Sequence, residues 1–234
     1  MQFGGFMRVL VLGIGNILFG DEGIGVHLMN YLKLNYKFTP PLDSAPTKSS
    51  TQKTNLPKTS LQKTSLPKTN LPKSNELDSS ENPKHSLEKY SLEFIDGGTL
   101  AQALIPLIVE YDFVLILDTV DVRGGNIGDV YSFPFDALPK QVSWAGSAHE
   151  VEMLQTLRLT QIMGDLPKIH IVGIIPEIIG EDTTFALSSE LLSKVHTMEK
   201  EAIKQLESLG FVATKIDSPL SLQDIADKSY KGFD

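Results

Sequence analysis

Short, β-branched apolar runs alternate with helical patterns along most of the chain, and this alternation constrains the fold more than any other feature. The runs typical of strands are 8–13, 92–95, 113–117, 129–133, 169–175 and 211–216. The helical patterns cover 22–34, 100–109, 150–163 and 187–209. Parallel strands need crossover connections of this length. The sequence therefore predicts an α/β fold with three layers: a mostly parallel, twisted β-sheet with helices on both faces and an edge strand at 129–133 that can run antiparallel.

One stretch interrupts this pattern. Residues 54–73 repeat a five-residue unit (TNLPK, TSLQK, TSLPK, TNLPK), and no aromatic residue occurs between Phe38 and Tyr90. Such a segment cannot bury enough apolar surface to offset the entropy lost on ordering. We expect a disordered, low-complexity insertion over 39–89 and a mobile tail over 217–234. The whole chain, 1–234, is then a single domain.

Composition excludes several classes of protein. The chain has no cysteine, which excludes a thiol nucleophile and any cysteine-ligated metal cluster. Its 29 acidic residues against 21 basic ones argue against nucleic acid as a partner. No apolar run reaches the ~18 residues of a membrane span, so we expect no membrane insertion. No signal-peptide cleavage site follows the first apolar run, and we expect a cytoplasmic protein. We also expect a monomer, because no long heptad or exposed apolar stripe is evident.

The loop after the first strand, residues 13–25, is rich in glycine and ends in two adjacent acids. Its Gly-x-Gly start resembles a dinucleotide fingerprint, but Leu18 stands where the third glycine belongs. Asp21 and Glu22 fall at the start of a helix, where they would repel a pyrophosphate. A cation suits this loop better. The alternative is that both acids only complement the helix dipole.

Two more strands end in acids. Asp96 follows the run 92–95, and Asp118 follows the run 113–117. Parallel sheets bind ligands beyond the carboxyl ends of their strands. A simple turn is the alternative explanation for Asp96 and its two glycines.

His149 lies in a loop of small residues that leads into a helix, whereas we expect the other four histidines to pack in the core or lie on the surface. Glu22, Asp96 and His149 would form a set of two carboxylates and one imidazole. Such a set suits nickel, iron, manganese or zinc. Three ligands leave coordination positions open for a substrate or water.

These motifs resemble those of the [NiFe]-hydrogenase maturation endopeptidases. The resemblance covers about 7–37 and 90–215, and its motifs are residues 9–26, 96–99, 117–120, 147–149 and 172–177. It implies a peptidase domain with a phosphorylase/hydrolase-like sheet. Members of this family remove a short C-terminal extension from the hydrogenase large-subunit precursor after nickel has been inserted.

The resemblance also implies roles for individual residues. Glu22, Asp96 and His149 match the family's proposed nickel-contacting residues, and the nickel is carried by the substrate rather than permanently bound. The family is conventionally classed as aspartic-type, yet this chain has no paired Asp-Thr-Gly motifs. We therefore expect metal-assisted hydrolysis. Asp21, Asp118 or a metal-bound water is the proton acceptor, and the sequence leaves these three alternatives open.

Two other functions use the same residues. One is a metal-sensing chaperone or binding module that recognises the large subunit without cutting it. The other is a self-sufficient metallohydrolase that holds its own zinc.

Overall fold

The computed structural model describes residues 6–41, 89–99, 101–137, 142–143, 148–177 and 182–231, with only the backbone of 101–102, 142–143 and 148–153. All of these residues belong to one structural unit. The predicted insertion over 39–89 falls almost entirely outside the described residues and stays a prediction. Its first residue, Thr39, closes a strand, and its last, Lys89, directly precedes another.

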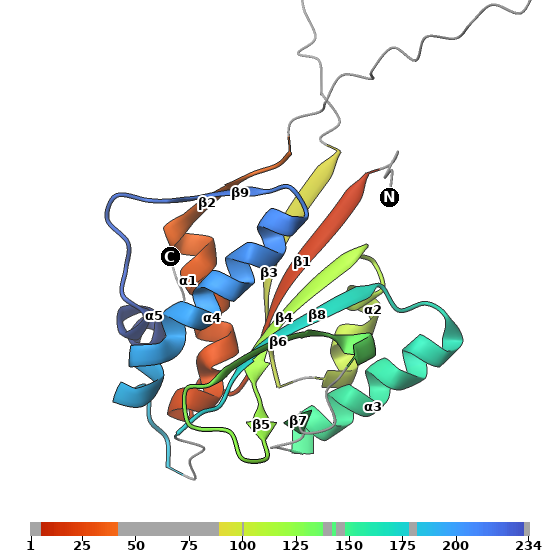
Figure 1. Ribbon diagram of the computed structural model, residues 1–234. Helices are drawn as coiled ribbons and strands as arrows, with labels where there is room; N and C mark the ends of the chain where they lie inside the picture. Colours follow the sequence, from red (N-terminus) through yellow and green to blue (C-terminus); the bar gives the residue numbers. More distant parts are fainter. Residues whose placement is uncertain are drawn as a thin grey trace, which may run out of the picture. The chain divides into compact units, whose positions relative to one another are not determined.

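A five-stranded sheet forms the centre of this unit (Figure 1). The strand order is β3-β1-β4-β8-β6. The bounds are β1 Met7–Ile14, β3 Tyr90–Gly98, β4 Phe113–Thr119, β6 Val130–Pro134 and β8 Lys168–Ile174. Neighbours among β3, β1, β4 and β8 pair in parallel, and β6 pairs antiparallel with β8 at the edge. The predicted α/β architecture, including the antiparallel edge strand, is confirmed.

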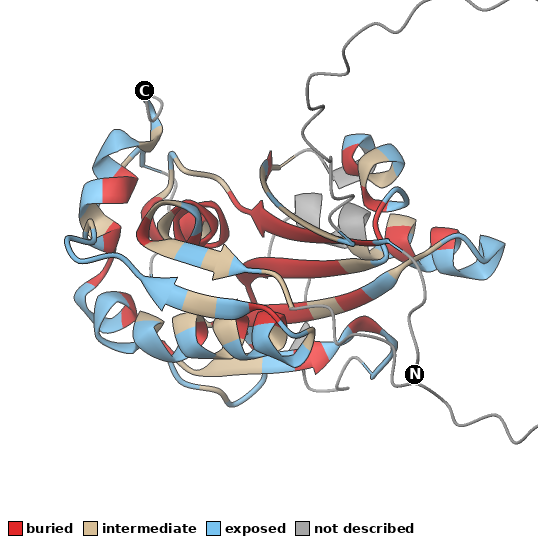
Figure 2. Cartoon of the chain, turned by 90° about the horizontal axis from the view of Figure 1, so that it is seen from above, coloured by how far each residue is buried: buried red, intermediate tan, exposed pale blue. Residues whose placement is uncertain are grey.

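Helices cover both faces of the sheet. The helices α1 (Ile24–Asn35) and α4 (Ser189–Ser208) pack on one face, while a 3-10 turn η2 (Ala101–Leu104), the short α2 (Ile105–Ile108) and α3 (Ala148–Met163) lie on the other. Along β1, Val9 and Val11 join the first core cluster, and Leu10 and Leu12 join the second. Burial on both faces explains why the central strands are nearly continuous apolar runs. Figure 2 shows the buried residues concentrated in these strands and on parts of the surrounding helices.

The glycine-rich loop allows α1 to approach the strand ends closely. Before α1 lies a 3-10 turn, η1 (Gly20–Gly23). A Cβ on Gly25 would lie 2.1 Å from the carbonyl oxygen of Leu117 and 2.2 Å from that of Ile14. Gly25 therefore lets the first turn of α1 rest directly on the carboxyl ends of β1 and β4. The glycines of this loop serve backbone packing, which accounts for them without a nucleotide.

The C-terminal segment differs from its prediction. Residues 222–229 form a helix, α5 (Leu222–Ser229), within the stretch expected to be a mobile tail. A capping box at Ser221 and Asp224 starts the helix, and Leu222, Ile225 and Ala226 are buried where α5 packs against α1. The prediction of a tail over 217–234 is wrong for this helix; residues 232–234 lie outside the described part.

Other local predictions need smaller corrections. The helix predicted over 100–109 is only η2 followed by the single turn α2, which contains Pro106. The predicted last strand, β9 (Val212–Lys215), pairs antiparallel with β2 (Tyr36–Thr39) outside the main sheet. Two further short elements, β5 (Asp121–Val122) and β7 (Val142–Ser143), pair beyond the end of β4, and η3 (Phe135–Ala137) follows β6. No helix in the described ranges is long and apolar enough to span a bilayer.

His27 is a buried polar group of α1. Its side chain is 0% exposed, and neither ring nitrogen has a hydrogen-bond partner among the described residues. Burial lowers the pKa of His27 from 6.5 to about 4, and the charge of Asp227 in α5 offsets only part of this effect. The folded protein therefore holds His27 in its neutral form at neutral pH.

Gly25→Ala should destabilise the protein, although alanine normally favours a helix over glycine by about 1 kcal/mol. The added Cβ would overlap two backbone carbonyls that cannot move independently of the sheet. We expect a loss of about 3 kcal/mol or more in the free energy of unfolding, measured by chemical denaturation. Gly164→Ala is the control. Gly164 has φ 89°, and a Cβ added to it would meet no heavy atom within 4 Å, so only a backbone cost of about 1–2 kcal/mol remains. Wild-type stability of Gly25→Ala would contradict the close approach.

Ile225→Ala should lower the free energy of unfolding by about 2–5 kcal/mol, because Ile225 is 0% exposed between α5 and the body of the fold. Ile216→Ala is the matched control, since Ile216 is the same residue type nearby and is 43% exposed. Equal, small effects of the two substitutions in urea denaturation would mean that α5 does not pack as described.

The stability of the protein should fall as the pH drops from 6.5 towards 4, in part because of His27. In this window the unfolded chain binds a proton at His27 that the folded chain does not, so folding is favoured fully above pH 6.5 and progressively less below it. The effect is on the order of 3 kcal/mol at its limit. His27→Leu should remove this part of the pH dependence, while His196→Leu, on the exposed side of α4, should not. Denaturation curves at several pH values measure both.

Candidate functional site

The carboxyl ends of four parallel strands meet at one edge of the sheet, and the predicted acids lie there. In the register of the sheet, Gly13 of β1 is opposite Asp96 of β3 on one side and Leu117 of β4 on the other. Asp118, the next residue of β4, is opposite Gly173 of β8. The structure therefore places Asp96 and Asp118 in the two strands that flank β1, at nearly the same level.

Gly15 joins the turn that carries Asp96 to the turn that carries Glu22. Its amide donates a hydrogen bond to the carbonyl oxygen of Gly98 at 3.0 Å. With φ 136°, Gly15 also lies so close to Glu22 that an added Cβ would be 2.0 Å from the carbonyl oxygen of Glu22. Asp96 is exposed and accepts a hydrogen bond from the amide of Gly98 at 2.8 Å, while Glu22 is partly buried. Only a residue without a side chain fits between these two turns.

His149 is the second residue of α3, and the structure describes its backbone only. Since α3 precedes β8, which runs parallel to β4, its first turn lies at the carboxyl edge and its last turn at the amino edge (Figure 1). The helix packs against η2, which begins shortly after the Asp96 turn. Three chain segments thus bring Glu22, Asp96 and His149 to one edge. Among the described side chains, which do not include that of His149, no group of three forms a metal site.

Asp21 and Asp118 are placed differently from Asp96. They are 0% and 1% exposed, respectively. Asp21 accepts hydrogen bonds from the amide of Glu177 at 3.0 Å, the amide of Ser188 at 2.8 Å and the hydroxyl of Ser188 at 2.7 Å. Asp118 accepts one from the amide of Thr119 at 2.7 Å. Both predicted proton acceptors therefore lie beneath the surface of the site.

Residues 182–188 also belong to this region, although none of the sequence motifs includes them. Thr184 forms a parallel bridge with Phe19, through hydrogen bonds from Gly20 to Thr184 and from Thr184 to Leu18, each 2.8 Å long. Ser188 is the N-cap residue of α4, and its hydroxyl accepts a hydrogen bond from the amide of Leu191 at 3.2 Å. The sequence pattern predicts a helix start at Ser188 or Ser189, which agrees with this cap. No sequence pattern predicts the contact between Ser188 and Asp21.

An exposed carboxyl pair lies beside this segment. A hydrogen bond with Glu190 is the main cause that raises the pKa of Glu177, and the nearby charges of Glu190 and Asp21 act in the same direction. Hydrogen bonds with Ser189 and then with Glu177 lower the pKa of Glu190. Glu177 is therefore the member of the pair that takes up a proton first as the pH falls.

The other histidines in the described ranges lie as expected, in the core or near the surface. His27 is fully buried, and His196 is exposed on α4. His170 of β8 is within 2.9 Å of the hydroxyl of Ser132, and partial burial lowers the pKa of its ring. His85 lies outside the described residues.

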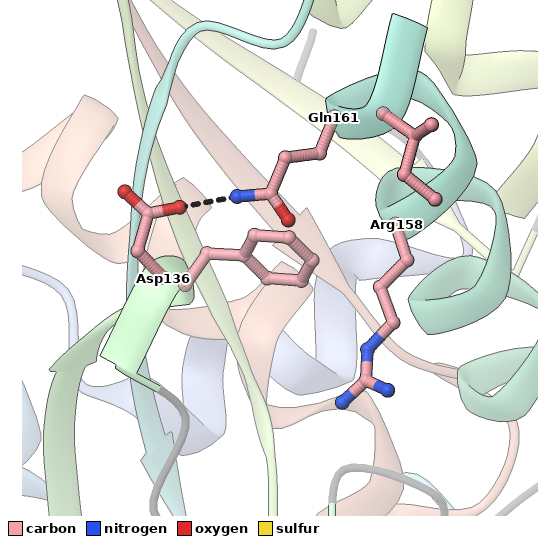
Figure 3. Close-up of a pocket in the computed structure, with 5 residues that line it drawn as sticks. Asp136, Arg158 and Gln161 are labelled. Carbon is pink, nitrogen blue, oxygen red and sulfur yellow. Dashed lines mark hydrogen bonds between the residues drawn. The ribbon is translucent and has the colours of Figure 1, made fainter.

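A pocket of about 340 Å³ lies away from the candidate site (Figure 3). It is lined by Phe135, Asp136, Arg158, Gln161 and Ile162, and the side-chain amide of Gln161 donates a hydrogen bond to Asp136. These residues belong to η3 and to the last turns of α3, at the end of the helix opposite His149. The pocket is therefore not part of the candidate site.

Exposed apolar side chains accompany this pocket on α3. Leu159, Ile162 and Met163 are 63%, 81% and 75% exposed. The prediction that the chain has no exposed apolar stripe is therefore wrong for α3. The monomeric state, which rests on it, stays a prediction.

Comparisons with known proteins agree on one family. The family model HycI, hydrogenase maturation protease, matches residues 76–205. Protein HydD of Wolinella succinogenes is 56% identical over 142 residues, which cover 61% of this chain and 89% of HydD. The hydrogenase 2 maturation protease of Escherichia coli is 24% identical over 172 residues, which cover 73% of this chain and 74% of that protein.

A solved structure has the same fold. It is the hydrogenase maturating endopeptidase HybD from Escherichia coli, with a TM-score of 0.60 and 20% identity, and the match covers 89% of this chain and 98% of HybD. At this identity the likeness concerns the fold alone. Because the family model spans more than half of the 234 residues, the chain belongs to the hydrogenase maturation protease family.

Proposed function

We propose that this protein is an endopeptidase that removes the C-terminal extension of the nickel-loaded [NiFe]-hydrogenase large-subunit precursor. Glu22, Asp96 and His149 recognise the nickel carried by that precursor. The family membership supports the peptidase activity. The main support for this site is the contact at Gly15, which holds the turns of Glu22 and Asp96 beside each other at the carboxyl edge.

The chemistry of the donor set suits a metal that arrives with the substrate. Two carboxylates and one imidazole offer three oxygen or nitrogen ligands and no thiolate, since the chain has no cysteine. The cysteines of the large subunit would supply the soft ligands. A protein that inspects nickel held by another chain's thiolates then has no thiolates of its own to compete for it.

The burial of Asp21 and Asp118 favours one of the three alternatives for the proton acceptor. A general base must reach the attacking water directly or through one other water. Both carboxylates are almost completely buried, so we propose that the nickel ion itself lowers the pKa of a bound water. The water would release its proton to solvent, and its oxygen would add to the scissile carbonyl carbon, which the same ion would polarise. When the peptide C–N bond breaks, the leaving amine would take up a proton from solvent, so that one water is consumed and no net proton is released.

The structure gives less support to an aspartic-type dyad than to metal-assisted hydrolysis. Such a dyad needs two carboxylates that share a proton within reach of the substrate. Both oxygens of Asp21 accept hydrogen bonds from Glu177 and Ser188 instead. For this chain, the hydrogen bonds of Asp21 therefore favour metal-assisted hydrolysis over an aspartic-type dyad.

Purified protein should shorten the nickel-loaded precursor at its C-terminus and leave the nickel-free precursor intact, as measured by intact-protein mass spectrometry. Asp96→Asn should lower the cleavage rate by about 100-fold or more, because it removes an anionic ligand that acts in the transition state. The matched control is Asp121→Asn, which changes an exposed acid of β5 near the same edge and should cleave at the wild-type rate. Glu22→Ala and His149→Ala should be as inactive as Asp96→Asn while remaining folded.

Each alternative has its own outcome in this experiment. Stable binding of the nickel-loaded precursor without any mass loss would identify a metal-sensing chaperone. Stoichiometric zinc in the protein as purified, together with cleavage of the nickel-free precursor, would identify a self-sufficient metallohydrolase. Full processing by the triple alanine variant of Glu22, Asp96 and His149 would remove these residues from the mechanism.

A further inference from the structure

We infer that Asp21 is a positioning residue that fixes Glu22 at the site by holding the segment 182–188 against η1, and that it is not the proton acceptor. This inference rests on the proposed function, because Glu22 is taken as a nickel-contacting residue. It assigns a separate task to each of the two adjacent acids. Glu22 faces the substrate, and Asp21 fixes the backbone from which Glu22 projects.

The hydrogen bonds of Asp21 show which parts of the chain it joins. Its Oδ1 accepts from the amide of Ser188, and its Oδ2 accepts from the amide of Glu177 and from the hydroxyl of Ser188, all at 2.7–3.0 Å. Glu177 follows β8, and Ser188 caps α4. One carboxylate therefore holds both ends of the connection between β8 and α4 to the first loop of the protein.

The turn that carries Glu22 needs this external support. The 3-10 turn η1 has four residues and no side-chain cap at Phe19. So short a 3-10 turn has weak internal hydrogen bonds. The amide of Glu22 donates to the carbonyl oxygen of Phe19 at 3.2 Å, and Phe19 is in turn bridged to Thr184. The conformation of Glu22 thus depends on residues that lie more than 150 positions later in the sequence.

The same segment is supported from outside by α5. The side chain of Gln223 accepts a hydrogen bond from the amide of Leu187 at 3.0 Å and donates one to the carbonyl oxygen of Phe185 at 3.0 Å. A chain of contacts therefore runs from α5 through residues 185–188 to Asp21 and Glu22. The helix α5 therefore contributes to the support of the site.

The burial of Asp21 is consistent with a positioning residue and not with a general base. Asp21 is 0% exposed, so neither water nor a substrate peptide reaches its oxygens in this structure. Its donors include two backbone amides, which do not leave when a side chain rotates. A carboxylate satisfied in this way organises the backbone around it.

Ser188→Ala tests the inference because it leaves Asp21 in place and removes the hydroxyl that binds it, which also caps the first turn of α4. We expect kcat for cleavage of the nickel-loaded precursor to fall by about 10- to 100-fold, as is typical when a group that supports a metal-contacting residue is lost. Ser188→Thr keeps a hydroxyl and should restore most of the activity. Ser189→Ala, a change one residue away whose hydroxyl contacts Glu190, should cleave like the wild type.

The pH profile of Asp21→Asn distinguishes a positioning residue from a base. If Asp21 only positions Glu22, the residual activity of Asp21→Asn should keep the acid limb of the wild-type profile. If Asp21 is the base, the acid limb should disappear in Asp21→Asn, and Ser188→Ala should cleave at nearly the wild-type rate. That second pattern would overturn the inference.

Amide hydrogen exchange supplies a readout that does not depend on cleavage. The amides of Gly20 and Glu22 should exchange faster in both Asp21→Asn and Ser188→Ala than in Ser189→Ala, because the turn loses its support. If the wild type fails to cleave any precursor, the proposed function falls, and exchange alone still tests the support of the turn. Unchanged exchange at both amides in both variants would overturn the inference, whatever the activity.

Discussion

The contact between α1 and the strand ends is the constraint on which the rest of the site depends. Gly25 places the backbone of α1 directly over the terminal carbonyls of β1 and β4. This contact fixes where the preceding turn η1 lies, and Gly15 then joins that turn to the end of β3. A side chain at either glycine would push these backbones apart. The glycine-rich motif is therefore a packing device that sets the spacing of two acidic turns.

The four acids of this edge (Asp21, Glu22, Asp96 and Asp118) differ in their environment, and this difference determines what each can do. Asp96 lies in an exposed turn and Glu22 is partly buried, so these two can meet a ligand. Asp21 and Asp118 lie beneath them, and their charge is balanced by backbone amides and, for Asp21, by a hydroxyl as well. Amides and hydroxyls that point at a buried carboxylate make it part of the scaffold. The same residue type is thus exposed at the edge in one layer and a buried structural support in the next.

Much of the fold could be predicted because the central strands are buried on both faces. The runs that became β1, β4 and β8 are apolar at nearly every position, whereas the run 129–133 includes the polar residues Asp129 and Ser132, as an edge strand can. The helix α5 escaped prediction although Ser221 and Asp224 have capping-box spacing, since few apolar residues follow them. The contacts of Asp21 could not be predicted at all. Its partners lie 156 and 167 residues away, and only the folded chain brings them together.

The place where the low-complexity segment joins the fold has a consequence for how this protein can vary. Pro41, the last described residue before it, packs near Gly210, and the carbonyl oxygen of Lys89, just after it, accepts a hydrogen bond from the amide of Met7 at 2.7 Å. Both attachment points belong to the amino edge of the sheet, at the far end of the strands from Glu22 and Asp96. A change in the length of this connection would therefore meet the described fold at the edge opposite the candidate site.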